Sequence, residues 1–79
     1  MLTSVMIVED NKSLQLLLEN IIKDNDFCFC AGVCSSAEEA LVAVPDLLPD
    51  VVLMDIGLPG MDGIECVRKL KPLCPGVEF

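Results

Sequence analysis

Residues 49–63 read PDVVLMDIGLPGMDG, and this stretch determines how the rest of the chain is interpreted. Its first half is a run of four apolar residues, Val51 to Met54, with an aspartate on each side. An apolar run without alternation is typical of a strand that is buried on both faces, as in a parallel sheet. The second half, from Gly57 to Gly63, is rich in glycine and proline, which predicts a loop. The stretch therefore predicts a buried strand that ends at Asp55 and opens into a loop.

The N-terminal part of the chain repeats this form. Val5 to Val8 is again a continuous apolar run, and it stops at the acidic pair Glu9 and Asp10. In residues 12–23 the leucines and isoleucines have helical spacing, which predicts a helix that packs one apolar stripe on the sheet. That stripe consists of Leu14, Leu17, Leu18, Ile21 and Ile22.

The remaining segments extend the alternation of strands and helices. Residues 27–33 predict a strand, and Ser36 with Glu39 has the spacing of a capping box at the start of a helix. Prolines at 45 and 49 are expected to end that helix. Residues 64–70 predict a third helix and residues 77–79 the start of a fourth strand. This order predicts an α/β fold, a doubly wound parallel sheet with helices on both faces, in which residues 1–79 form one domain.

Composition excludes several classes of function. Thirteen acidic and five basic residues give a net charge of −8, which argues against direct binding to nucleic acid or to an anionic membrane. No apolar run reaches the roughly 18 residues of a membrane span, and the N-terminus lacks the features of a secretory signal, so a cytoplasmic protein is expected. The five cysteines include no CxxC pair and the chain has no histidine, so buried thiols in a reducing compartment are favoured over a zinc site.

Acidic residues follow the first and third predicted strands. Since the carboxyl ends of parallel strands lie at one edge of the sheet, Glu9, Asp10 and Asp55 converge if those strands are neighbours. Three carboxylates would repel one another, and an all-oxygen set of this kind suits Mg²⁺, which leaves room for a phosphoryl oxygen. The alternative is that these acids are solvated loop residues or helix caps, and the spacing alone leaves both interpretations open.

Residues 7–11 (IVEDN) and 49–63 together resemble the receiver domain of two-component response regulators. The resemblance covers residues 5–79 and is most specific in the segment 49–63. It implies a flavodoxin-like receiver fold, of which this chain would form roughly the N-terminal two-thirds, with strands one to three and the start of strand four.

The resemblance also implies a role for each residue of the acidic edge. Asp55 would take a phosphoryl group from a sensor histidine kinase or a phosphotransfer protein. Mg²⁺ would be held by Glu9, Asp10, Asp55 and the backbone carbonyl of Gly57, and the Ile56 amide would face the phosphoryl oxygens. Glu9 stands where the family more often has aspartate. A domain of this kind is a phosphoacceptor rather than an enzyme with a separate substrate, and the resemblance leaves a downstream DNA-binding output domain open.

The chain also departs from the family pattern. The family's switch hydroxyl follows the fourth strand and its phosphate-binding lysine follows the fifth, so both would lie beyond Phe79. Lys69 and Lys71 do not match that lysine by motif. Pro59 and Gly63 do match, as residues that shape the loop and start the third helix.

Two other functions are considered for this sequence, and the second of them lacks a residue that it needs. A non-phosphorylated module could act through self-association, as a homodimer, because the apolar strand 51–54 would have one unpaired edge. An aspartyl phosphatase would need the pattern Asp-x-Asp, and Gly57 occupies the second acidic position.

Overall fold

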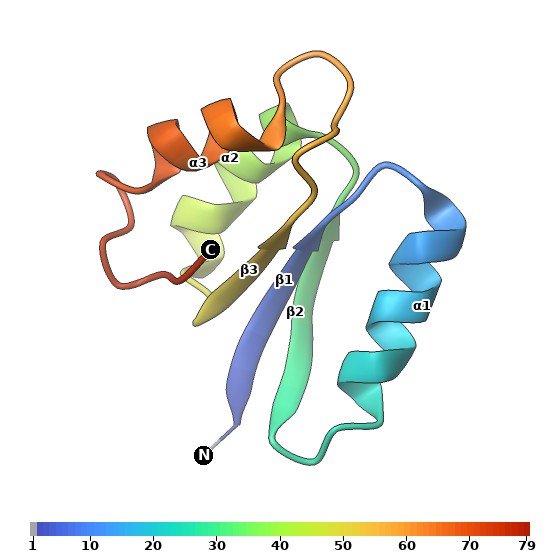
Figure 1. The fold of residues 1–79 in the computed structure, drawn as a ribbon. Coiled ribbons are helices and arrows are strands. Elements are labelled where there is room, and N and C mark those ends of the chain that lie inside the picture. The colour runs from blue at the N-terminus through green and yellow to red at the C-terminus, as the bar shows by residue number, and fades with distance from the viewer. Residues whose placement is uncertain (1) are drawn as a thin grey trace.

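The computed structural model describes residues 2–79, and its elements follow the predicted order (Figure 1). The three strands form one parallel sheet in the order β2-β1-β3, so the strands that carry the acidic residues are neighbours. The elements are β1 (Thr3–Val8), α1 (Lys12–Lys23), β2 (Cys28–Cys34), α2 (Ala37–Leu47), β3 (Val51–Met54) and α3 (Gly63–Leu70). Among the described residues, no helix has the length and apolar character needed to cross a membrane.

The two faces of the sheet are covered unequally (Figure 1). The side with α2 and α3 holds the larger core, in which Met6 and Val8 of β1 pack with Val44 and Leu70. The side with α1 holds a smaller cluster of Val5, Ile7 and Ile22. Because alternate residues of β1 point to opposite faces, this single strand contributes to both cores, as expected for a central strand.

The register of β1 and β2 shifts by one residue near the middle of the sheet. Val5 pairs with Cys30 and Met6 with Gly32, so Ala31 is an extra residue in β2. The shift changes which face the later residues of β2 occupy. Cys28 and Cys30 pack on the α1 side, whereas Cys34 is buried on the α2 side. All five cysteines are free thiols, and Cys34, Cys66 and Cys74 are buried as predicted, whereas Cys28 and Cys30 are only half-buried.

Two predictions about the helices are wrong in part. In α1 the contact row consists of Gln15, Leu18 and Ile22, whereas Leu17 and Ile21 are 56% and 58% exposed. The predicted stripe therefore included a second row that faces solvent. In α2 the helix continues through Pro45 to Leu47, and Leu48 ends it in the left-handed conformation with φ of 46°.

The start of α2 and the end of the chain match their predictions. Ser36 caps α2, because its Oγ accepts a hydrogen bond of 3.1 Å from the Glu39 N–H. At the C-terminus, Glu78 forms one parallel bridge with Val51, and the Val52 N–H donates to the Glu78 carbonyl at 2.8 Å. This bridge covers the first half of the outer edge of β3.

Candidate phosphoacceptor and metal site

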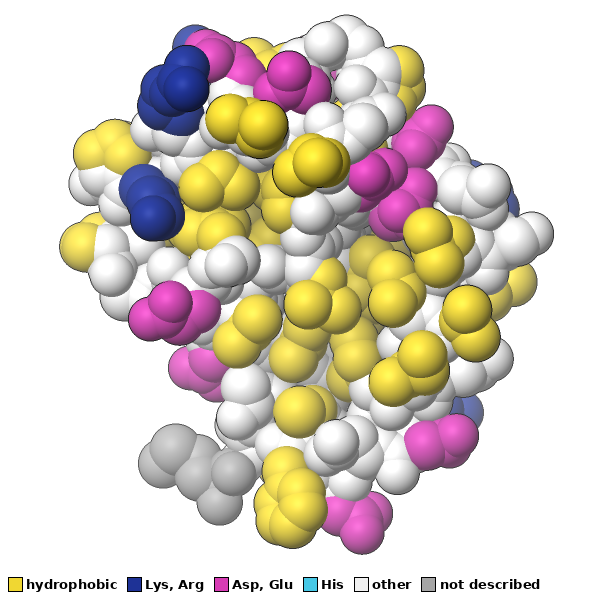
Figure 2. Space-filling model, in the orientation of Figure 1, with side chains coloured by type: hydrophobic (Ala, Val, Ile, Leu, Met, Phe, Trp, Pro, Cys, Tyr) yellow, Lys and Arg dark blue, Asp and Glu magenta, His cyan; other side chains and the backbone are white. Residues whose placement is uncertain are grey.

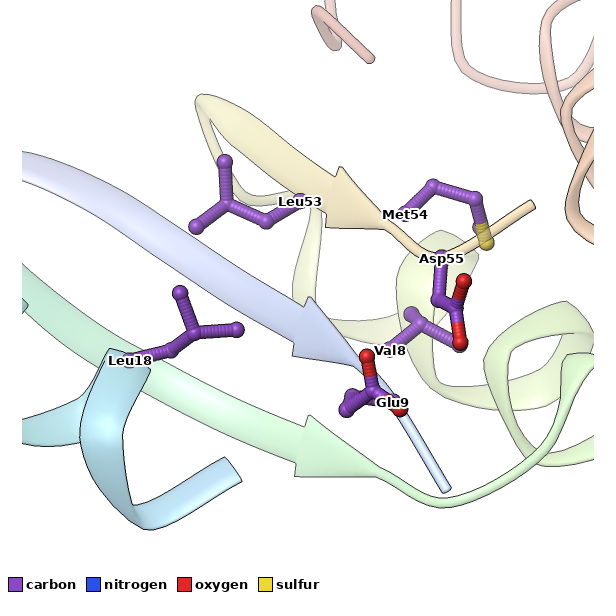
Figure 3. Close-up of a pocket in the computed structure, with 6 residues that line it drawn as sticks. All are labelled: Val8, Glu9, Leu18, Leu53, Met54 and Asp55. Carbon is purple, nitrogen blue, oxygen red and sulfur yellow. The ribbon is translucent and has the colours of Figure 1, made fainter. Parts of the chain in front are cut away.

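The pairing of β1 with β3 brings three carboxylates together. Val8 pairs with Met54, so the next residues of both strands emerge side by side, and the Asp55 N–H donates to the Val8 carbonyl at 3.0 Å. Glu9, Asp10 and Asp55 each offer a carboxylate oxygen, and these atoms lie within 4.8 Å of one another. Figure 3 shows the Glu9 and Asp55 side chains close together at the ends of the two strands. The predicted convergence of the three acids is therefore confirmed.

Glu9 is the most enclosed of the three acids. Its side chain is buried at 5% exposure, and its Oε2 accepts a hydrogen bond of 3.1 Å from the Asn11 N–H. That hydrogen bond lowers the pKa of Glu9, but burial and the neighbouring carboxylates of Asp55 and Asp10 outweigh it and leave the pKa raised. The carboxylates of Glu9, Asp10 and Asp55 lie close enough to repel one another, and a bound cation would relieve that repulsion.

The loop after β3 holds Asp55 in a defined orientation. The Gly57 N–H donates to Asp55 Oδ1 at 2.9 Å, and the Gly63 N–H donates to the Ile56 carbonyl at 3.3 Å. A Cβ atom on Gly63 would lie 2.3 Å from the Asp55 carbonyl oxygen, so only glycine allows α3 to begin this close to the strand end. Gly60 turns the loop with φ of 75°, and Asp62 caps α3.

A hollow of about 240 Å³ lies beside the acids (Figure 3). Apolar side chains from α1, β1 and β3 form its walls, and the carboxylates stand at one end. Its lining residues are Val8, Glu9, Leu18, Leu53, Met54 and Asp55. The hollow is large enough for a hydrated cation or a small anionic group next to Asp55.

The acids have no basic partner within the described part of the chain. The two ion pairs found there join Glu65 to Arg68 and Lys69, both on α3. Carboxylates without nitrogen or sulfur donors form a ligand set that fits a hard divalent cation such as Mg²⁺. The roles expected for the Gly57 carbonyl and the Ile56 amide stay predictions, since the contact seen here is the one between the Gly57 N–H and Asp55.

Sequence reasoning missed a buried polar side chain next to the site. Gln15 of α1 is 7% exposed, and its amide donates to the Glu9 carbonyl and, at 3.1 Å, to Ser35 Oγ. The signal for it was the spacing of residues 15, 18 and 22, which places Gln15 on the same row as the half-buried Leu18 and the buried Ile22.

Residues 5–78 of the chain match the family model of the response regulator receiver domain. The chain belongs to this receiver domain family. The acidic cluster of Glu9, Asp10 and Asp55 resembles the phosphorylation and Mg²⁺ site of this family.

Similar proteins place receiver domains in several contexts. The chain is 41% identical over 71 residues to protein-glutamate methylesterase/protein-glutamine glutaminase 2 of Burkholderia thailandensis, covering 90% of this chain and 20% of that protein. It is 34% identical over 77 residues to chemotaxis protein CheY of Listeria monocytogenes, covering 94% of this chain and 61% of CheY. The response regulator domain of Thermotoga maritima CheB superposes with a TM-score of 0.93 at 27% identity, over 99% of this chain and 58% of that one. The chain therefore spans about three fifths of the receiver domains that it matches.

Proposed function

We propose that Asp55 accepts a phosphoryl group from the phosphohistidine of a sensor histidine kinase or a phosphotransfer protein. The observation that supports this most directly is the cluster of carboxylate oxygens of Glu9, Asp10 and Asp55 within 4.8 Å. In the transfer, an Asp55 oxygen bonds to phosphorus while the bond between phosphorus and the histidine nitrogen breaks. The leaving nitrogen keeps the bonding electrons, and a proton on the other ring nitrogen of the phosphohistidine makes the leaving group the neutral imidazole.

The surroundings of Asp55 suit this role. Its Oδ1 accepts the Gly57 N–H, so Oδ2 is the oxygen left to act as nucleophile. Glu9, Asp10 and Asp55 would hold Mg²⁺, together with the carbonyl of Gly57, and the Ile56 amide would meet a phosphoryl oxygen. The bound ion would neutralise negative charge on the phosphoryl group as it approaches the acids.

The wider setting of the domain belongs to the same proposal. Residues 1–79 act as one receiver unit that is phosphorylated and has no separate substrate to turn over. We place this unit in the cytoplasm, and a DNA-binding output domain in the full-length protein is one candidate for what it controls. The net charge of −8 makes the receiver unit itself unsuited to bind DNA.

Metal dependence of phosphorylation tests the proposal. The chain is incubated with a small phosphodonor, either with Mg²⁺ or with EDTA, and intact mass is followed over time. We expect the mass of one added phosphoryl group with Mg²⁺ only, and a much slower gain in Asp10→Asn. A gain of equal rate in EDTA would contradict the proposed site.

Self-association through β3 is a second candidate function, supported by the outer edge of that strand. Beyond the Glu78 bridge, no further strand pairing on this edge occurs among residues 2–79. The hollow beside the acids lies on one side of β3. A second hollow, of about 300 Å³, lies on the other side of β3, next to α3. The second is lined by Met54, Ile56, Gly63, Ile64, Val67, Lys71 and Phe79. Figure 2 shows hydrophobic side chains gathered on this side of the molecule, over the strands and along α1.

Light scattering after size-exclusion chromatography tests the second candidate. We expect a dimer at micromolar concentration. We expect a shift to monomer in Leu53→Lys, which places a charge in the hollow beside the acids. Val42→Lys is the matched control, because Val42 is 75% exposed on α2, across the sheet from that hollow. Since each copy carries a charge of −8, higher salt should strengthen the dimer. A folded monomer at all concentrations would show that this edge does not pair with a second copy.

A further inference from the structure

The Gln15 side chain contacts two turns at the carboxyl ends of the strands, the β1–α1 turn and the β2–α2 turn. A polar side chain as buried as this one is costly unless its hydrogen bonds are satisfied. Its amide nitrogen satisfies this need by donating to the Glu9 carbonyl in the β1–α1 turn and to Ser35 Oγ in the β2–α2 turn. The other two residues of this row, Leu18 and Ile22, are apolar and pack on the sheet, so packing alone does not account for a glutamine.

Further hydrogen bonds join the same two turns. The Glu9 N–H donates to the Cys34 carbonyl at 2.9 Å, and Lys12 Nζ donates to Ser35 Oγ at 3.1 Å. The backbone of Glu9 is thus held at its N–H by β2 and at its carbonyl by Gln15. The Lys12 contact is exposed and therefore weak, whereas the Gln15 contact to Glu9 is buried and stronger.

We propose that Gln15 is a positioning residue for the metal site, a role that rests on the proposed function. The Glu9 carbonyl belongs to the peptide that links Glu9 to Asp10, so its orientation sets where the Asp10 side chain begins. By fixing that carbonyl, the Gln15 amide keeps the carboxylates of Glu9 and Asp10 directed toward Asp55. Ser35 in turn fixes the Gln15 amide.

The test compares Gln15→Met with Ile22→Met. Methionine is close to glutamine in size but has no amide to donate, and Ile22 is a buried residue on the same contact row of α1 that does not line the hollow beside the acids. Mg²⁺ binding is measured by calorimetry, and thermal unfolding is measured in EDTA. Changes to groups that orient metal ligands typically cost about 10- to 100-fold in affinity, so we expect a loss of about tenfold in Gln15→Met. Ile22→Met should bind as the parent does, and both variants should unfold near the parent temperature.

Hydrogen exchange of the Asp10 and Asn11 amides in EDTA gives a readout that needs no metal. We expect faster exchange in Gln15→Met and in Ser35→Ala, with no added effect when the two are combined. Unchanged exchange together with unchanged Mg²⁺ affinity would overturn the positioning role and leave the proposed function standing. A parent chain that binds no Mg²⁺ would overturn both.

Discussion

Two aspartates flank β3, and they have opposite surroundings. At the amino end, Asp50 Oδ2 accepts hydrogen bonds from the Ser4 N–H at 2.8 Å and the Ser4 hydroxyl at 3.1 Å. At the carboxyl end, Asp55 accepts one backbone N–H and faces the carboxylates of Glu9 and Asp10. The same residue type is therefore a structural anchor at one end of the strand. At the other end it adds to a charge cluster that a bound cation would relieve.

Gly63→Ala should have the largest effect on stability, and it acts at the Asp55 end. The added Cβ would overlap the Asp55 carbonyl oxygen at 2.3 Å, so the strand end or α3 must shift. We expect a loss of about 3 kcal/mol in the free energy of unfolding, at the upper end for overpacked sites, measured by denaturant unfolding. Gly76→Ala is the control, because a Cβ there meets nothing within 4 Å. Equal stability of the two variants would show that α3 does not fix the acceptor loop.

Neutralising the two aspartates should change stability in opposite directions. In EDTA, Asp50→Asn should lose about 1 kcal/mol, because its hydrogen bonds to Ser4 are strengthened by the charge. Asp55→Asn should gain stability by a similar amount, since it relieves repulsion with Glu9 and Asp10. Urea unfolding of both variants beside the parent measures the two changes. Changes of the same sign would remove the distinction between the two ends of β3.

A smaller effect concerns pH at the Asp55 end. Because the pKa of Glu9 is raised in the folded chain, the folded state binds that proton more tightly than the unfolded state does. The resulting stabilisation is present at low pH and is lost as pH rises through the raised pKa. Calorimetry in EDTA should therefore show a higher melting temperature when pH is lowered from 7 toward about 5, and a weaker rise in Glu9→Gln. The same rise in both would rule out Glu9 as its source.

Most of the fold and the acidic edge could be predicted because they depend on local patterns. Apolar runs that stop at an acid locate the strand ends, and adjacency of β1 and β3 then brings Glu9, Asp10 and Asp55 together. Helical spacing shows that α1 has an apolar side, but two neighbouring rows fit it, and only the packed structure selects the row that contains Gln15.

Other features depend on contacts between distant residues. Ser4 and Asp50 are far apart in the chain, so nothing local predicts the hydrogen bonds that hold Asp50. The extra residue Ala31 in β2 is set by pairing with β1 rather than by its own sequence. Pro45 is expected to help end α2, but the helix continues past it to Leu47.

Mapping of the phosphorylated residue tests the central claim most directly. The parent, Asp55→Asn and Asp50→Asn are each treated with a small phosphodonor and Mg²⁺, and the labelled peptide is located by mass spectrometry. We predict label on Asp55 in the parent and in Asp50→Asn, and no label in Asp55→Asn. Label that persists in Asp55→Asn, or that lies on Asp50, would contradict the assignment of Asp55 as the phosphoacceptor.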